Sequence, residues 1–419
     1  MPSDATKLAW LSRSDTLLCM LIPLFLLVDC INGALLQLHG SSYGLSQLYK
    51  LVLLALMAFT LLLHQRRWAL GLLLTLLLML VGPAIHWSQL AMRWALADIQ
   101  LAIKALSPLL AFVYLSGLAQ RAPLQAQQLF KHTLLFSGVV LLLNALAGIA
   151  GFGFSAYQPL DGVAQSFLGI KGFFYSTNEL SAVLLVLSCA LLCLSWPRHK
   201  LAYALCSAIA LLLALSLLTK TGVFGVVLLL LLIPLLLQPA LFWRRQKTLL
   251  LVLAVFALLL TVLFIVNAEA LLRMLGIYDK LNFVYQQRGI SGILLSSRDY
   301  YAGRIWHSTA EHYSDWQRLL GVGQGGVALY LKKYFAELDW FDLLIFYGVT
   351  GLAVFILTFA VFIRHSWQCR AQGVGRVLLL LNGLLLLVSA LAGHILTSGM
   401  LWLPWALCNA LLLHSATQA

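Results

Sequence analysis

The sequence predicts an all-α protein that crosses a membrane many times, and three observations lead to that prediction. Of the 419 residues, 62% are hydrophobic and only 10% are charged, whereas a soluble domain of this size carries about a quarter charged residues. The mean hydropathy is +0.94. Apolar runs of about 20 residues recur along the chain, which is the length a helix needs to cross a hydrocarbon core of about 30 Å.

These apolar runs give twelve candidate spans. They cover residues 16–36, 48–63, 69–86, 97–118, 133–151, 178–196, 201–218, 222–238, 248–267, 340–363, 377–396 and 399–414. No small-residue cleavage site precedes Asn32, so we expect the first span to be retained rather than removed as a signal peptide. A short turn at Thr397 and Ser398 separates the last two spans.

The spans divide the chain into three parts. Residues 1–267 hold transmembrane helices 1–9, residues 268–339 form one large loop, and residues 340–419 hold helices 10–12. With the N-terminus in the cytoplasm, fourteen of the 27 lysines and arginines fall in cytoplasmic segments, and four fall in the short connections on the other side. This bias follows the positive-inside rule. It predicts that both termini lie in the cytoplasm and that the 268–339 loop lies on the outer side of the membrane.

The net charge of +13 needs no nucleic-acid partner, because about half of the basic residues already lie where anionic lipid attracts them. The acidic residues are distributed differently. Only Asp4 and Asp15 fall on the cytoplasmic side, and the other twelve of fourteen lie in the outer halves of spans or in outer loops. This one-sided distribution predicts a polar cavity that opens to the outer side of the membrane.

Several polar residues are expected within the outer halves of the spans, where a charge is costly unless it is paired or hydrated. They are Asp29, Asn32, Asp98, Lys104, Asn178, Glu179, Lys220 and His394. The 268–339 loop adds arginines, carboxylates and, up to Trp340, ten tyrosines and tryptophans, and its stretch 299–320 has helical periodicity. Arginine binds diphosphate through two hydrogen bonds, and aromatic faces cover sugar rings. The alternatives are an interfacial aromatic belt for the loop and structural ion pairs for individual charges.

Two short motifs carry little weight. Gly321-Val-Gly-Gln-Gly-Gly326 matches GxGxxG, but it follows no predicted strand, so we interpret it as a turn. His307 and Glu311 share one helix face, but no third ligand stands at a convincing spacing. We therefore expect neither a metal nor a cofactor.

A resemblance rests on the order of short motifs. They are Asp29-Cys-Ile-Asn-Gly33, Ser46-Gln-Leu-Tyr-Lys50, Asp98 to Lys104 with Pro108, Gly172-Phe-Phe-Tyr-Ser-Thr-Asn-Glu-Leu180, Thr219-Lys-Thr-Gly222, Ser297-Arg298, Leu320-Gly-Val-Gly323, Glu337-Leu-Asp-Trp-Phe-Asp342, Tyr347-Gly-Val-Thr-Gly351 and Ala392-Gly-His394. In this order the chain resembles the O-antigen ligase/polymerase superfamily. Ligases carry a histidine eleven residues before the glycine that corresponds to Gly348, and here that position is Glu337. The resemblance is therefore to a Wzy-type O-antigen or exopolysaccharide polymerase.

The resemblance implies a GT-C-like glycosyltransferase of the bacterial inner membrane with a periplasmic active site. It also implies that the donor is undecaprenyl-diphosphate-linked glycan. A hydroxyl of the acceptor attacks the anomeric carbon, and undecaprenyl diphosphate leaves. Such a reaction needs cations for the leaving group and a base for the hydroxyl. We expect Arg298, followed by Lys220, Arg304 and Arg288, to bind the diphosphate. We expect Glu337, or alternatively Asp339, to be the base, with a pKa raised toward neutrality by desolvation.

The remaining expectations follow from the same resemblance. Asn178, Lys104 and His394 are expected to contact substrate, and a chain-length-regulating co-polymerase is an expected partner. Glu337 and Asp339 also have the spacing of a divalent-metal pair, which the arginines make unnecessary. Two other functions stay open: an O-antigen ligase that transfers glycan to lipid A-core, and a flippase for the same lipid-linked glycan. A flippase would be expected to show two related halves, and none is visible.

Overall fold

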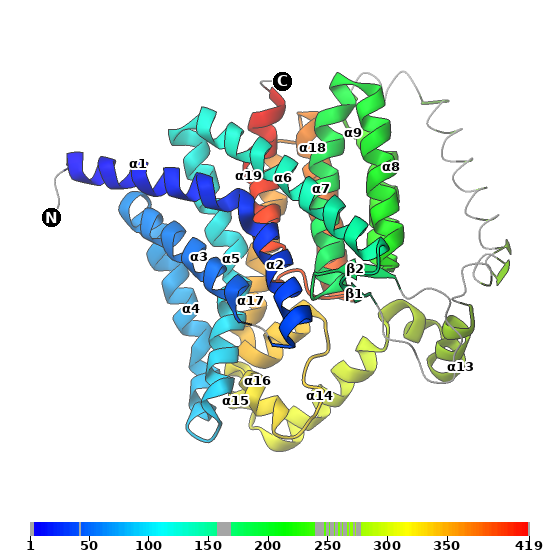
Figure 1. Ribbon diagram of the computed structural model, residues 1–419. Helices are drawn as coiled ribbons and strands as arrows, with labels where there is room; N and C mark the ends of the chain where they lie inside the picture. The colour runs from blue at the N-terminus through cyan, green and yellow to red at the C-terminus, as the bar shows by residue number, and fades with distance from the viewer. Residues whose placement is uncertain are drawn as a thin grey trace.

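The computed structural model describes residues 4–41, 43–156, 169–238 and 278–417, together with isolated positions between 247 and 273. The described chain is almost entirely helical (Figure 1). The expected span 248–267 lies largely outside the described residues.

Ten helical segments make up the first half of the described chain. They are α1 (Asp4–Leu21), η1 (Ile22–Leu24), α2 (Phe25–His39), α3 (Leu45–His64), α4 (Arg66–Trp87), α5 (Met92–Arg121), α6 (Pro123–Ile149), α7 (Thr177–Arg198), α8 (Lys200–Leu217) and α9 (Lys220–Leu236). A short antiparallel hairpin, β1 (Phe154–Ser155) and β2 (Ile170–Gly172), lies between α6 and α7.

The second half holds a group of shorter helices followed by three longer ones. They are α13 (Tyr278–Leu295), α14 (Arg298–His312), α15 (Asp315–Leu320), α16 (Gly323–Ala328), α17 (Asp339–Gln368), α18 (Gly373–Leu391) and α19 (Trp402–Thr417). Helices α14–α16 lie at the end of the bundle away from the C-terminus, at the bottom of Figure 1.

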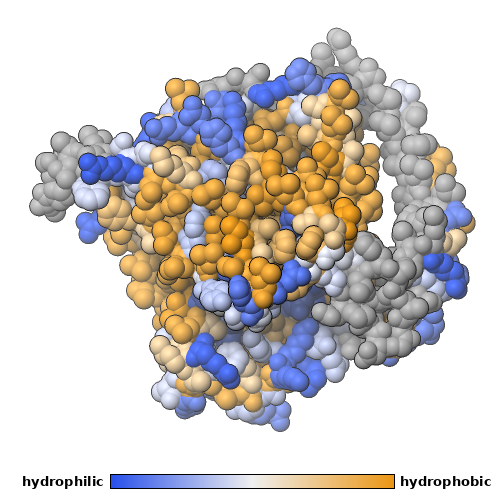
Figure 2. Space-filling model, in the orientation of Figure 1, coloured by the Kyte–Doolittle hydropathy of each residue, from blue (hydrophilic) through white to orange (hydrophobic). Residues whose placement is uncertain are grey.

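The described helices confirm a multi-pass membrane protein. Nine of them are long and apolar enough to cross a membrane, and α9 is a shorter apolar helix of 17 residues. Hydrophobic side chains cover the middle of the molecular face in Figure 2, and hydrophilic ones gather above and below. Such a band is what a hydrocarbon core selects. The number twelve stays a prediction, because α9 and the 16-residue α19 are short and the ninth span is not described.

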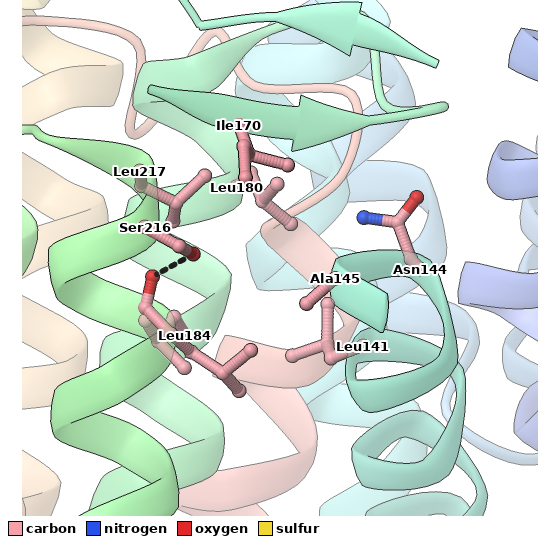
Figure 3. Close-up of a pocket in the computed structure, with 9 residues that line it drawn as sticks. Leu141, Asn144, Ala145, Ile170, Leu180, Leu184, Ser216 and Leu217 are labelled. Atoms are coloured by element: carbon pink, nitrogen blue, oxygen red, sulfur yellow. Dashed lines mark hydrogen bonds between the residues drawn. The ribbon is translucent and has the colours of Figure 1, made fainter. Parts of the chain in front are cut away.

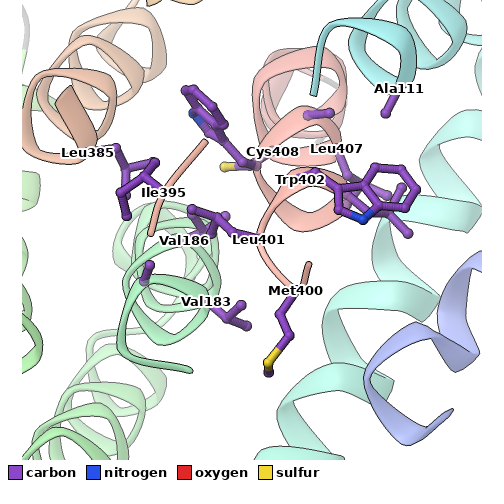
Figure 4. Packing of buried hydrophobic residues seen from close by; sticks show 14 of the residues in the cluster. Ala111, Val183, Val186, Leu385, Ile395, Met400, Leu401, Trp402, Leu407 and Cys408 are labelled. Carbon is purple, nitrogen blue, oxygen red and sulfur yellow. The ribbon is translucent and has the colours of Figure 1, made fainter. Parts of the chain in front are cut away.

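The centre of the bundle is built around α19, which packs against α5, α6 and α7 (Figure 1). Trp402 and Trp405 of α19 are fully buried, and Trp405 stacks on Phe362 of α17 at 4.2 Å between ring centroids. Figure 4 shows the aliphatic side chains that surround this helix. Asn382 and Asn409 hydrogen-bond to each other at 2.7 Å inside this core, so their buried amides are paired as burial requires.

The last two expected spans are joined differently from the prediction. Helix α18 ends at Leu391 and α19 begins at Trp402, so a largely buried loop, residues 392–401, replaces the expected two-residue turn. Gly393 and His394 both have positive φ, of 64° and 60°. Non-helical backbone inside a membrane protein must be buried in protein with its polar groups paired. Asp339 supplies much of that pairing, as described below.

The predicted helix over 299–320 is broken in two. Ser314 and Gln317 form a capping box that starts α15 after the end of α14 at His312. The glycine motif is partly helical, since α16 begins at Gly323. The Asp98 carboxylate accepts a hydrogen bond of 2.7 Å from the Gln324 backbone N–H at the start of this helix. The motif therefore packs against α5 through Asp98.

Glycines let α15 and α16 approach the membrane helices closely. A Cβ on Gly82 of α4 would lie 2.1 Å from the Leu320 carbonyl oxygen, and one on Gly348 of α17 would lie 1.9 Å from the Leu319 carbonyl oxygen. Gly348 also has a φ of 62°, which favours glycine. These contacts fix the end of α15 onto α4 and α17.

Candidate functional site

Arg298 lies at the first position of α14, after Ser297 with its positive φ of 68°. Its side chain is 10% exposed, and one guanidinium nitrogen, Nη2, donates to Glu337 Oε2 at 3.3 Å. Nη1 donates to the Leu295 carbonyl oxygen at 3.4 Å. The buried Nε has no partner among the described residues. The guanidinium is therefore held in place with donor capacity left over.

Glu337 stands in the segment between α16 and α17, with a φ of 66°. Its second oxygen, Oε1, lies 3.3 Å from Lys333 Nζ. The Lys333 ammonium also lies 4.0 Å from the ring centroid of Tyr301 on α14, a cation–π contact. One carboxylate is thus held between two cations, and its side chain remains 30% exposed.

His394 reaches the same place from the 392–401 loop. A Cβ on the preceding residue, Gly393, would lie 2.0 Å from the Glu337 carbonyl oxygen, so the two backbones touch. The charge of His394 acts on the Glu337 carboxylate. We call Arg298, Lys333, Glu337 and His394 the Glu337 cluster.

The pKa of Glu337 is lowered, whereas the sequence-based expectation was a raised pKa. Burial raises it, but Lys333, His394 and Arg298 lower it by more, so the net pKa is below the ordinary value of 4.5. The predicted rise toward neutrality is therefore wrong for the protein without ligand. Three positive or ionisable neighbours outweigh desolvation because the carboxylate stays partly exposed.

Asp339 lies two residues further on in a different environment. Its residue is 1% exposed. Its carboxylate accepts from the backbone N–H groups of His394, Ile395 and Leu396 at 2.8–2.9 Å, and from the hydroxyls of Ser389 at 2.5 Å and Thr397 at 2.8 Å. Five donors fill its lone pairs. Asp339 thus anchors the loop that carries His394, and it has no room to act as a base.

The other predicted site residues lie apart from these contacts. The Lys220 ammonium donates to the Ile293 carbonyl oxygen. Arg304 is exposed on α14, 5.9 Å from the Tyr300 ring. Asn178 opens α7, and Lys104 lies in a separate cluster on α5. Arg288 belongs to α13, and its side chain lies outside what the structure describes.

Lys333 is the member of the Glu337 cluster that the sequence-based prediction missed. Its signal was present, since Lys333 and Glu337 stand four residues apart with opposite charges. In the described part of the chain, no group of three or more histidines, cysteines or acids gathers as a metal site would require. His312, near the weak His307–Glu311 motif, stacks on Tyr330 at 3.7 Å.

Two hollows lie elsewhere. One of about 20 Å³ lies between α6, α7, α8 and β2, lined by Leu141, Asn144, Ile170 and Leu217 (Figure 3). It has room for about one water molecule. A groove of about 200 Å³ lies between α14, α15 and α17, beside Trp306 and Arg318. The Glu337 cluster lines neither hollow.

Comparison with family models, curated proteins and solved structures finds no match. A function for this chain therefore has to be inferred from its own residues. The Glu337 cluster offers two cations that can face an anion, and a carboxylate able to accept a proton.

Proposed function

We propose that the protein is a polysaccharide polymerase of the inner membrane. It joins undecaprenyl-diphosphate-linked repeat units on the periplasmic face, with both termini in the cytoplasm. The observation that carries the proposal is the Glu337 carboxylate, held 3.3 Å from both Arg298 and Lys333 at one end of a multi-pass bundle. The motif order described above supplies the class of substrate.

In the proposed reaction, the acceptor hydroxyl oxygen forms a bond to the anomeric carbon of the donor. The bond from that carbon to the diphosphate oxygen breaks, and the diphosphate leaves with the electron pair. Glu337 takes the hydroxyl proton, a contribution of about 10²–10⁴-fold. Arg298 and Lys333 face the charge that grows on the diphosphate, where fixed cations lower the barrier most.

Arg298 and Lys333, which lower the pKa of Glu337, are also the proposed ligands of the diphosphate. A diphosphate that binds Arg298 and Lys333 competes with Glu337 for both cations. The carboxylate then loses the neighbours that lower its pKa, while its burial remains. Substrate binding would thus raise the pKa of Glu337 and make it a better base only when a donor is present.

His394 is proposed to contact the acceptor or the leaving group beside Glu337. Asp339 is proposed to act through the 392–401 loop, as a positioning residue that holds His394 in place. The position that carries histidine in ligases is Glu337 here, and this favours a polymerase.

The experiment is a gel of surface polysaccharide and lipid-linked intermediates from cells that lack the protein. We expect single lipid-linked repeat units to accumulate where a ladder should be. Full-length polymer left on its lipid carrier would contradict the proposal and indicate a ligase. Lipid-linked units trapped on the cytoplasmic face would contradict it and indicate a flippase.

A further inference from the structure

A second group of charges lies inside the bundle. Asp29 of α2, Lys50 of α3, Lys104 of α5 and Glu179 of α7 meet beside the 392–401 loop, and we call them the Lys104 cluster. Three of them, Lys50, Lys104 and Glu179, lie around Gly399. A Cβ there would lie 3.6 Å from Lys104 Cε, 3.8 Å from Lys50 Nζ and 3.9 Å from Glu179 Oε2. The Lys50 ammonium, the Glu179 carboxylate and the last carbon of the Lys104 side chain thus surround one position.

Three of these four charges have partners. Lys50 pairs with Asp29 at 2.6 Å, and Ser46 also donates to Asp29. Glu179 accepts from the Ser398 hydroxyl at 2.6 Å and from the Met400 N–H at 3.2 Å. The other oxygen of Asp29, Oδ2, is enclosed without a hydrogen bond.

Lys104, unlike the other three residues, has no such partner among the described residues. Its ammonium makes no hydrogen bond or ion pair within 4 Å with any residue that the structure describes, although Glu179, Lys50 and Asp29 act on it electrostatically. Lys104 is half-buried and its ammonium is not fully enclosed, so an anionic ligand can reach it and neutralise its charge. Its three donors, with the Lys50 ammonium beside the same point, suit a phosphoryl group, whose oxygens are strong acceptors.

We propose that Lys104 and Lys50 form a second phosphoryl-binding site, separate from the Glu337 cluster, for the phosphate of a prenyl-linked glycan. The proposal rests on the function proposed above, in which the acceptor carries a prenyl diphosphate as the donor does. The 392–401 loop joins the two sites, with His394 at one and Ser398–Met400 at the other. The five Cα–Cα steps from His394 to Gly399 span at most about 18 Å when the chain is fully extended. Two lipid-linked glycans bound at this separation would lie side by side.

The test measures binding to the purified full chain in dodecyl maltoside, which has no phosphate. The probes are farnesyl diphosphate and inorganic pyrophosphate. We expect Arg298→Gln, which disables the first site, to leave measurable binding of farnesyl diphosphate. Adding Lys104→Met should weaken this remaining binding about tenfold or more, as the loss of a charge-assisted contact predicts. Adding Lys131→Met, which replaces an exposed lysine of α6, should not weaken it.

The two probes identify the source of the phosphate. Pyrophosphate that shows the same dependence on Lys104 supports a site for the phosphoryl group alone, whether free or lipid-linked. Dependence seen only with farnesyl diphosphate supports a lipid-linked ligand. Equal binding by Arg298→Gln with and without Lys104→Met would overturn the proposal.

A stability measurement separates a binding role from a structural one. If Lys104 is a ligand site, Lys104→Met removes an unpaired charge, so the Tm without ligand should stay the same or rise. Lys50→Met should lower the Tm, because it leaves Asp29 unpaired. An equal fall in both variants would make Lys104 a structural residue and overturn the proposal. Binding needs no turnover, so a chain that binds at both sites but makes no polymer would refute only the proposed function.

Discussion

Two carboxylates that stand two residues apart in the chain have opposite environments. Glu337 is partly exposed, lies between Arg298 and Lys333, and has a lowered pKa. Asp339 is 1% exposed and accepts from five donors, four of which belong to the 392–401 loop. The difference shows that two acids of one motif can have different environments. Glu337 is accessible to a ligand, whereas Asp339 holds the 392–401 loop in place.

The division has a physical origin. A buried carboxylate is tolerated only when its lone pairs are filled, and filling them removes it from chemistry. A carboxylate that is paired only with ammonium and guanidinium side chains can exchange those partners for a ligand. The comparison therefore predicts that changes at Asp339 act on folding, and changes at Glu337 act on activity.

The largest effect is expected for Asp339→Ala. This change leaves three loop N–H groups and two hydroxyls without their acceptor, at a cost of about 3–5 kcal/mol in the free energy of unfolding. The measurement is the Tm of the purified protein and its level in membranes. A stable Asp339→Ala protein that has lost only activity would contradict the structural role of Asp339.

The next effect is expected for Glu337→Gln, with loss of polymer at an unchanged protein level. The amide cannot accept the proton, so a decrease of about 10²–10⁴-fold in rate is expected. The matched control is Glu311→Gln, which changes an exposed carboxylate of α14. Polymer of normal length from Glu337→Gln would remove Glu337 from the reaction.

A smaller effect is expected for Lys333→Gln. The lysine is 45% exposed and contributes one of the two cations at Glu337. Its loss should slow polymerisation about tenfold, the value of one charge-assisted contact, and lower the free energy of unfolding by less than about 1 kcal/mol. A rate equal to that of the unchanged protein would show that Arg298 alone faces the leaving group.

The smallest effect is expected from pH. Because the folded pKa of Glu337 is below 4.5, its ion pairs contribute their full stabilisation above 4.5, and this is lost as the pH falls through the lower folded value. Thermal unfolding of the protein without ligand should show this acid limb, and Glu337→Gln should flatten it. An acid limb centred above 4.5 in the protein without ligand would contradict the lowered pKa.

Sequence reasoning predicted the membrane class and most of the Glu337 cluster, because apolar run length and residue chemistry are local properties. Arg298, Glu337 and His394 were expected together, and they meet. Lys220 and Arg304 were also expected there, but the direction of a side chain is set by packing. Lys220 instead donates to Ile293.

Sequence reasoning could not separate Glu337 from Asp339. The distinction depends on the 392–401 loop, which the apolar pattern presented as two spans with a short turn. Its irregular backbone follows from Asp339 and from the close approach of Gly393 to Glu337, both of which are tertiary contacts. The sequence predicted Asp29, Lys104 and Glu179 among the polar residues of one outer cavity. It did not predict Lys50 as their neighbour, because that depends on the packing of α3.

A charge exchange between Arg298 and Glu337 tests the central claim most directly. Polymer length and Tm would be measured for Arg298→Glu, Glu337→Arg and the double variant. If the two residues bind the leaving group and accept the proton, the double variant should recover the Tm lost by either single change and still make no polymer. Polymer restored together with stability would show that the pair is only an ion pair, and would contradict the account.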